Sequence, residues 1–353
     1  MSILFAILLF SFLIFIHEFG HFIAAKLSGV QVNEFAMFMG PAIVKWKRGE
    51  TQYSIRCIPI GGYCAMEGED SESDNPRAFG KAAWWKRLII LVAGSAMNFI
   101  AGLLIFLIVF APAKQFVVPV VSQIEEGCAI AGEYGIQEGD RILELDGEKI
   151  YVQGDFSMLL AFNTGDVHDL VLERNGEKII LDDFLMEKKE FPNEDGTTSL
   201  RYGFSFGEVE ATFINTLDYV WNSALDTVRN VRLSLQMILT GKAGLKDMTG
   251  PVGIVQIMSD TAEQSETALD AVLNMLYFGG FLAVNLAVMN MLPIPALDGG
   301  RAVCLLLTTI VEAITKKKIN PKYEAYLHGI GMVLLLALMA VILFKDVFTI
   351  FKG

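Results

Sequence analysis

The sequence is poor in cysteine, histidine and charge. It has four cysteines and four histidines in 353 residues, and only 19% of its residues are charged. The formal net charge of −12 excludes a generally basic surface of the kind that binds nucleic acid, so we expect no nucleic-acid partner. No disulfide framework is indicated either, because the cysteines are scattered and form no CxxC pair: Cys57, Cys64, Cys128 and Cys304.

Hydrophobic residues, by contrast, make up 53% of the chain and gather in four long runs. Crossing a hydrocarbon core of about 30 Å takes roughly 20 helical residues, and each run is long enough. The first run has no preceding basic residue and no small-x-small cleavage site, so we interpret it as a retained span rather than a signal peptide. The sequence predicts a polytopic α-helical protein of the lipid bilayer with four transmembrane helices, at residues 1–26, 88–112, 272–298 and 326–348.

Basic residues indicate the orientation of the spans. They gather between the first two spans and between the last two, and lysine and arginine mark the cytoplasmic side of a membrane. We therefore expect both termini and the long 112–271 segment to be extracytoplasmic. The basic residues that carry this prediction are Lys26, Lys45, Lys47, Arg48, Arg56, Arg77, Lys81, Lys86, Arg87, Arg301, Lys316, Lys317, Lys318 and Lys322.

Residues 27–87 are predicted to be a cytoplasmic-side β-hairpin, a membrane-associated loop and a linker. The alternating stretches "AIVKWKRG" and "TQYSIRCIPI", separated by Gly49, predict two strands. The hairpin is either a small soluble one or a β-element at the membrane, whose unpaired edge near residues 42–60 could hold an extended peptide. An interfacial anchor is expected just before the second span, made of Trp84, Trp85, Lys86 and Arg87.

Residues 116–206 have the pattern of an independent extracytoplasmic domain. Short strands, glycine turns and a short helix near residues 153–162 are expected there, in a segment of small-domain size. Residues 208–271 follow as an amphipathic helix and a turn at "GPVG". The helix either lies on the membrane surface or packs on the extracytoplasmic domain. A cytoplasmic helix and a basic loop are expected at 299–325.

The first span carries the motif "HEFGH", in which His17, Glu18 and His21 form H-E-x-x-H. Positions i and i+4 share one face of a helix, so both imidazoles can bind one Zn²⁺ with Glu18 beside them as general base. The alternative is two buried histidines and a chance glutamate. Ionisable side chains inside a membrane are rare and functional by default, which favours the zinc interpretation.

A catalytic zinc needs a third protein ligand. His168 lies in the extracytoplasmic segment, on the wrong side, whereas position alone leaves His328 as an alternative. Asp298 in "NMLPIPALDGG" is the better candidate, because it follows the third span at the depth of His21 and the prolines before it break the helix. Asp298 could instead serve only as the N-cap of a helix over 299–314.

The two motifs together resemble the site-2 protease family, peptidase family M50, of intramembrane zinc metalloproteases. The stretches "IGGY", "GSAMNF" and "GPVGI" are similar to its bacterial branch, the regulator-of-sigma-E protease type, and the resemblance covers the whole chain. "AGEYGIQEGDRILELDGEKI" resembles a PDZ domain. There is room for one such domain, where the best-known members carry two.

The resemblance implies a fold and a set of roles. The fold is four transmembrane helices with a membrane-associated β-hairpin region and an inserted PDZ-like α+β domain. His17, His21 and Asp298 would hold one zinc ion and Glu18 would activate its water. Asn290, and also Asn98, would bind the substrate backbone or the oxyanion. For Asn98 a hydrogen bond between spans is an open alternative.

The implied function is regulated intramembrane proteolysis in the bacterial inner membrane. Substrates would be single-span membrane proteins, such as anti-sigma factors or remnant signal peptides, and the active site would face the cytoplasmic side. One alternative is a non-catalytic membrane scaffold that recruits partners through its PDZ-like domain. Another is a metal transporter, but the remaining spans supply few intramembrane ligands.

Overall fold

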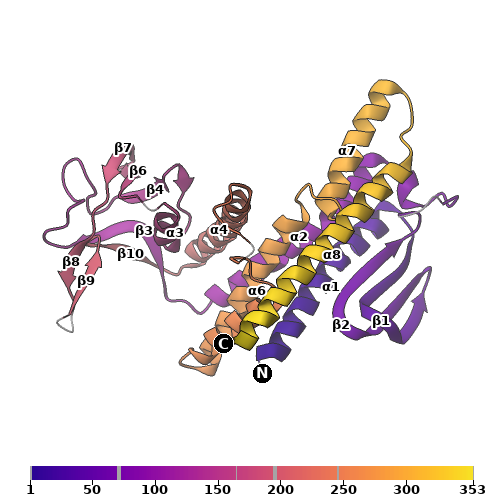
Figure 1. Ribbon diagram of the computed structural model, residues 1–353, viewed down its shortest axis with the longest axis horizontal. Helices are drawn as coiled ribbons and strands as arrows, with labels where there is room; N and C mark the ends of the chain where they lie inside the picture. The colour runs from indigo at the N-terminus through magenta and orange to yellow at the C-terminus, as the bar shows by residue number, and fades with distance from the viewer. Residues whose placement is uncertain (1, 70–72, 164, 194–196, 245, 353) are drawn as a thin grey trace. The chain divides into compact units, whose positions relative to one another are not determined.

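The computed structural model describes residues 2–69, 73–163, 165–193, 197–244 and 246–352. The chain forms two compact units, and the first contains the apolar helices while the second is mainly β-sheet (Figure 1). The first unit comprises residues 1–109 and 230–353, and the second comprises residues 110–229.

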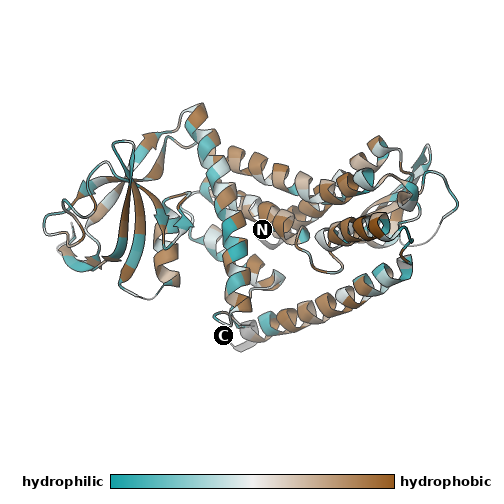
Figure 2. Cartoon of the chain, turned by 90° about the horizontal axis from the view of Figure 1, so that it is seen from above, coloured by the Kyte–Doolittle hydropathy of each residue, from teal (hydrophilic) through white to brown (hydrophobic). Residues whose placement is uncertain are grey.

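The predicted membrane-spanning helices are confirmed as four helices long and apolar enough to cross a bilayer. Figure 2 shows the hydrophobic colouring along most of the helix that ends at the C-terminus. The third helix ends at Asn290 rather than at 298, because Pro293 cannot continue it. The four helices are α1 (Ser2–Ser28), α2 (Trp84–Phe110), α6 (Ala268–Asn290) and α8 (Pro321–Lys352).

Glycines allow three of these helices to approach closely. A Cβ at Gly20 of α1 would lie 2.8 Å from the side chain of Met97 in α2, and one at Gly102 of α2 would lie 3.1 Å from the carbonyl oxygen of Gly280 in α6. Helices in a membrane lack a hydrophobic driving force between them and depend on such close contact of small residues. These contacts pack α2 closely against both α1 and α6.

Strands β1 (Val32–Arg48) and β2 (Thr51–Met66) form a sheet that differs from a simple hairpin. Both strands bend, so that residues 34–37 pair with 52–55 on one side and with 62–65 on the other. The bend of β1 lies at Phe38 and Gly40, which both have positive φ. Residues 51–56 therefore lie inside the sheet, and its two edges are residues 42–48 and 62–66.

The remaining helices of the first unit follow from local signals. α5 (Pro251–Glu263) begins at the "GPVG" turn, with proline in its first turn, where a missing N–H costs nothing. The carboxylate of Asp346 in α8 accepts a hydrogen bond of 3.0 Å from the amide of Gly253, in that same first turn. α7 (Asp298–Thr315) lies between α6 and α8 and ends at Lys316 in the left-handed conformation.

The second unit is built around an antiparallel sheet with the strand order β10-β3-β4-β6-β7, with β5 beside β4. Its core includes the fully buried Ile142, Leu145, Leu170 and Leu172. A short helix, α3 (Gly154–Phe162), lies where the sequence predicts one. The strands are β3 (Gln115–Ile124), β4 (Arg141–Leu145), β5 (Glu148–Lys149), β6 (Val167–Arg174), β7 (Glu177–Leu185), β8 (Lys189–Pro192), β9 (Thr198–Arg201) and β10 (Phe204–Glu210).

The predicted amphipathic helix is α4 (Phe213–Leu239). Within the second unit it packs on the sheet domain through Arg229, whose guanidinium lies 2.9 Å from the Asp155 carboxylate at the start of α3. Both side chains are almost fully buried. Tyr219, nearer the start of α4, also stacks on Phe116 of β3, with ring centroids 4.4 Å apart. Phe213 and Ile214, in the first turn, are 73% and 70% exposed. Within the second unit, one face of the helix therefore packs on the domain, and its first turn presents exposed apolar residues.

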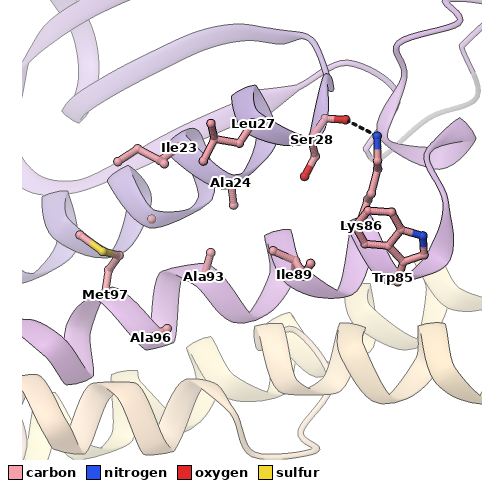
Figure 3. Close-up of a pocket in the computed structure, with 11 residues that line it drawn as sticks. Ile23, Ala24, Leu27, Ser28, Trp85, Lys86, Ile89, Ala93, Ala96 and Met97 are labelled. Atoms are coloured by element: carbon pink, nitrogen blue, oxygen red, sulfur yellow. Dashed lines mark hydrogen bonds between the residues drawn. The ribbon is translucent and has the colours of Figure 1, made fainter.

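An apolar groove runs between α1 and α2 (Figure 3). Lys86 closes one end, where its ammonium group donates a 3.0 Å hydrogen bond to the carbonyl of Ser28. Lys86 is the only ionisable side chain in the lining, so the groove lacks the groups that hydrolysis needs. It is lined by Gly20, Ile23, Ala24, Leu27, Ser28, Trp85, Lys86, Ile89, Ala93, Ala96 and Met97.

Candidate metal centre and active site

The H-E-x-x-H motif lies within α1, and its two imidazoles share one face of the helix. The Nε2 atoms of His17 and His21 are 3.2 Å apart. His21 is buried and the His17 side chain is only 12% exposed, so both rings point into the protein. The four-residue spacing therefore places both rings on one face of α1, as the sequence predicts.

Asp298 reaches the same point from the far end of the chain. Between Asn290 and Leu297 the backbone leaves the helix, and Ala296 has a positive φ of 81°. α7 then begins at Asp298, whose Oδ2 atom lies 3.1 Å from Nε2 of His17 and 3.2 Å from Nε2 of His21. The N-cap alternative for Asp298 is wrong, because the N-cap residue is Leu297 and no side chain caps the helix.

The three ligand atoms fit a zinc ion. In a tetrahedral site with bonds of about 2.0 Å, neighbouring ligand atoms are about 3.3 Å apart. The observed separations of 3.1, 3.2 and 3.2 Å are close to this value. Oδ2 of Asp298 is also buried without a hydrogen-bond partner among the described residues, although two imidazole nitrogens are near. An anionic oxygen in that state indicates a cation as its intended partner.

The outer nitrogens of the two rings contact α2. Nδ1 of His21 is 2.8 Å from the carbonyl oxygen of Ile90, which can only accept, so this nitrogen carries a proton and Nε2 is left with a free lone pair. Nδ1 of His17 is 3.4 Å from the amide nitrogen of Asn98. Gly94 lies between these contacts, and a Cβ there would be 2.8 Å from Cε1 of His17 and closer still to Nε2 of His21.

Glu18 lies between the metal centre and the sheet. It follows His17 directly, and its side chain is half-buried. The backbone of Cys64 is hydrogen-bonded to its carboxylate, and a Cβ at Gly62 would be 3.6 Å from its Cγ atom. The edge formed by residues 62–66 thus runs beside the glutamate that the motif predicts to be the base.

The other predicted site residues are placed differently. His168 belongs to the second unit, where its Nδ1 lies 2.8 Å from Asp146. Nδ1 of His328 accepts a 3.0 Å hydrogen bond from the amide of Ala296 and so supports the turn before Asp298. Asn290 is the last residue of α6, half-buried, and no hydrogen bond joins it to the histidines or Asp298 in the described part of the chain.

Sequence reasoning missed three contributors to this site. Gly94 leaves space for both rings, and the motif "GSAMNF" that contains it was the available signal. The role of the Ile90 carbonyl cannot be recognised in the sequence, because every residue has a backbone carbonyl. The sequence leaves His328 open as a ligand, whereas in the structure it supports the turn before Asp298.

This arrangement of side chains between apolar helices is typical of a membrane metallopeptidase. The comparison with known families agrees, since peptidase family M50 matches residues 5–338, and the chain belongs to this family. The protein is therefore a zinc metallopeptidase of the site-2 protease type, and a multi-pass protein of the bacterial membrane.

Several bacterial relatives share the whole length. A protein of Clostridium perfringens whose name assigns it to the zinc metalloproteases is 36% identical over 349 residues, which cover 98% of each chain. A Fusobacterium nucleatum protein with the same kind of name is 33% identical over 370 residues, covering 100% of both. The regulator of sigma-W protease RasP of Bacillus subtilis is 27% identical over 430 residues, covering 98% of both.

Proposed function

We propose that the protein hydrolyses peptide bonds within or near the transmembrane segments of single-span membrane proteins, with zinc held by His17, His21 and Asp298. The observation that carries the proposal is the convergence of the three ligand atoms, 3.1 to 3.2 Å apart, although Asp298 lies 277 positions after His21. When bound, zinc lowers the pKa of a water molecule toward about 7 and polarises the scissile carbonyl.

Glu18 is the general base of this proposal. Its carboxylate takes a proton from the attacking water and delivers it to the nitrogen of the leaving amine, which balances the two halves of hydrolysis. Hydrolysis needs water at the site, and the side chains of His17 and Asp298 are 12% and 20% exposed rather than fully buried. Asn290 binds the substrate backbone or the oxyanion from the end of α6, a role that the family resemblance implies.

The edge at residues 62–66 is the proposed binding place for the substrate backbone. A transmembrane helix cannot be cut while its carbonyls are bonded within the helix, so the substrate has to unwind and find new partners. An unpaired strand edge supplies them by β-augmentation. The edge that lies beside Glu18 is 62–66, which refines the 42–60 edge that the sequence suggested.

The topology and the second unit complete the proposal. The active site faces the cytoplasmic side, and both termini and the second unit are extracytoplasmic, as the basic residues suggest. The antiparallel sheet and α3 of the second unit support a PDZ-like domain that filters substrates by the size of their extracytoplasmic part. Substrates are anti-sigma factors or remnant signal peptides, and the name of the RasP relative favours the former.

Replacing Glu18 by Gln tests the mechanism. The amide cannot accept the proton, so we expect cleavage of a reconstituted single-span substrate to fall at least about 100-fold while zinc remains bound. Glu133→Gln, at an exposed position of the second unit, is the matched control and should cleave normally. Unchanged cleavage by the Glu18→Gln protein would remove Glu18 from the mechanism.

The scaffold alternative makes a different prediction for the same experiment. A non-catalytic scaffold would retain partner binding in both variants and would show no cleavage in either. The complete set of His17, Glu18, His21 and Asp298 favours the enzyme, because a scaffold has no need for the full set.

A further inference from the structure

Asn98 of α2 is a buried polar residue at the edge of the metal centre. It is 1% exposed, and its amide nitrogen lies 3.4 Å from Nδ1 of His17. Its amide oxygen is buried and has no hydrogen-bond partner among the described residues. An unpaired buried oxygen destabilises the folded protein, so its position calls for an explanation.

The chemistry of His17 supplies one. An imidazole can bind a cation through Nε2 only if Nε2 carries no proton, and the neutral ring then has its proton on Nδ1. That N–H needs an acceptor, which the Asn98 amide nitrogen cannot be. A half-turn of the amide exchanges its nitrogen and oxygen, so that the oxygen accepts from Nδ1 of His17. The same turn gives the unpaired oxygen a partner.

His21 shows the same arrangement in completed form. Its Nδ1 donates a 2.8 Å hydrogen bond to the backbone carbonyl of Ile90. Ile90 belongs to α2, the helix that also carries Asn98. Ile90 and Asn98 are eight residues apart in α2, on either side of Gly94, so one helix presents an acceptor to each ring. Outer partners of this kind fix the tautomer and orientation of a metal-binding histidine.

We infer that Asn98 is a positioning residue, which holds His17 in the tautomer and orientation that metal binding needs. The inference rests on the proposed function, in which His17 is a zinc ligand. It replaces the role in substrate or oxyanion binding that the sequence suggested for Asn98, and it develops the alternative of a hydrogen bond between spans.

Zinc affinity of the purified full-length protein, measured by chelator competition without substrate, tests this role. Asn98→Leu keeps the size of the side chain but removes the acceptor, and should weaken zinc binding roughly 10- to 100-fold. Asn98→Asp keeps an acceptor and should stay within about threefold of the parent. Ser95→Ala is the matched control, since Ser95 is buried on α2 and its hydroxyl has no hydrogen-bond partner among the described residues.

Cobalt substitution gives a second readout that needs neither substrate nor turnover. The visible spectrum of the cobalt-loaded protein should change with Asn98→Leu and be restored with Asn98→Asp, because it reports the ligand geometry. Parent-like zinc affinity and cobalt spectrum for Asn98→Leu, with only KM raised, would overturn the inference in favour of substrate binding. Equal weakening by the Leu and Asp variants would also overturn it, since retaining the acceptor would then have no effect.

Failure of this inference is distinguishable from failure of the proposed function. His17→Ala measured in parallel should lose zinc whether or not Asn98 acts on it. If His17→Ala binds zinc like the parent, the ligand set itself is wrong. If His17→Ala loses zinc and Asn98→Leu does not, only the role of Asn98 is refuted.

Discussion

Each unit of the protein contains a buried histidine beside an aspartate, and the two sites differ in how their hydrogen bonds are completed. In the second unit, both oxygens of the Asp146 carboxylate accept hydrogen bonds. The donors are Nδ1 of His168 at 2.8 Å, the side-chain amide of Asn163 at 3.0 Å and the backbone amide of Asp169 at 2.9 Å. This site is closed, and it holds β6 to the turn that follows β4.

In the first unit, Oδ2 of Asp298 is 3.1 and 3.2 Å from two imidazole nitrogens and still lacks a hydrogen bond among the described residues. Nearness of histidine and aspartate therefore does not by itself indicate a metal. The unfilled acceptor does, together with a third ligand atom at a tetrahedral distance. We therefore propose that the first site binds a metal ion, whereas the second stabilises the fold.

The largest difference between the two sites is expected for removal of a histidine. His17→Ala should reduce bound zinc from about one per chain to less than about a tenth, because three protein ligands define the site. Cleavage should fall at least about 10³-fold with it. His168→Ala should leave zinc at the parent level. Zinc content by atomic absorption checks both, and zinc loss in the His168→Ala protein would contradict the distinction.

Filling the space beside the two histidine rings is expected to have the next largest effect. Gly94→Ala places a methyl group against both rings, and we expect zinc affinity to fall about tenfold or more. Gly329→Ala on α8 is the control, because a Cβ there meets nothing within 4 Å. Chelator competition measures both variants. Parent-like affinity of the Gly94→Ala protein would show that the rings do not need the space that Gly94 leaves.

The two edges of the sheet are expected to differ in substrate contact. A photo-crosslinking residue at Ala65, on the 62–66 edge, should form adducts with a bound single-span substrate in the Glu18→Gln background. The same residue at Lys47, on the 42–48 edge, should form few. Mass spectrometry of the adducts measures the ratio, and preferential cross-linking from Lys47 would assign substrate binding to the other edge.

The smallest expected effect concerns the closed site. Burial raises the pKa of Asp146, but hydrogen bonds from Asn163, His168 and the Asp169 amide outweigh it and hold the pKa below its ordinary value. A carboxyl with a lowered pKa in the folded state stabilises that state above its unfolded pKa of about 3.9, and the contribution is lost as pH falls through the folded value.

Asp146→Asn should therefore destabilise the second unit by about 1 kcal/mol at pH 7 and by less near pH 3. Hydrogen–deuterium exchange of the peptide that contains Asp169, measured in the full-length protein, reports the difference locally. Exchange that is equally fast in both proteins at pH 7 would contradict the structural role of Asp146.

Local sequence signals predicted the features that depend on spacing. The interval between His17 and His21 sets a shared helix face, and the apolar runs set four helices, because both follow from helix geometry alone. The sequence predicts Asp298 as the third ligand because the chain offers few candidates and because the prolines before it break the helix. Its helix-cap alternative failed only when the structure placed Leu297 at the cap.

Features that depend on packing could not be predicted from local sequence patterns. The bends at Phe38 and Gly40 decide that residues 34–37 have partners on both sides, and alternation of apolar residues cannot reveal a strand that folds back. The acceptors for the histidine rings belong to α2, and their use depends on how α1 and α2 pack. The orientation of the Asn98 amide becomes a question only once His17 lies beside it.

X-ray absorption at the zinc edge of the purified full-length protein tests the central claim most directly. We expect a first shell of two imidazole nitrogens and carboxylate or water oxygens at about 2.0–2.2 Å, and a zinc signal from the His17→Ala protein below about a tenth of the parent signal. A shell that contains sulfur, a shell without two imidazole nitrogens, or a parent-like signal from the His17→Ala protein would contradict the proposed ligands.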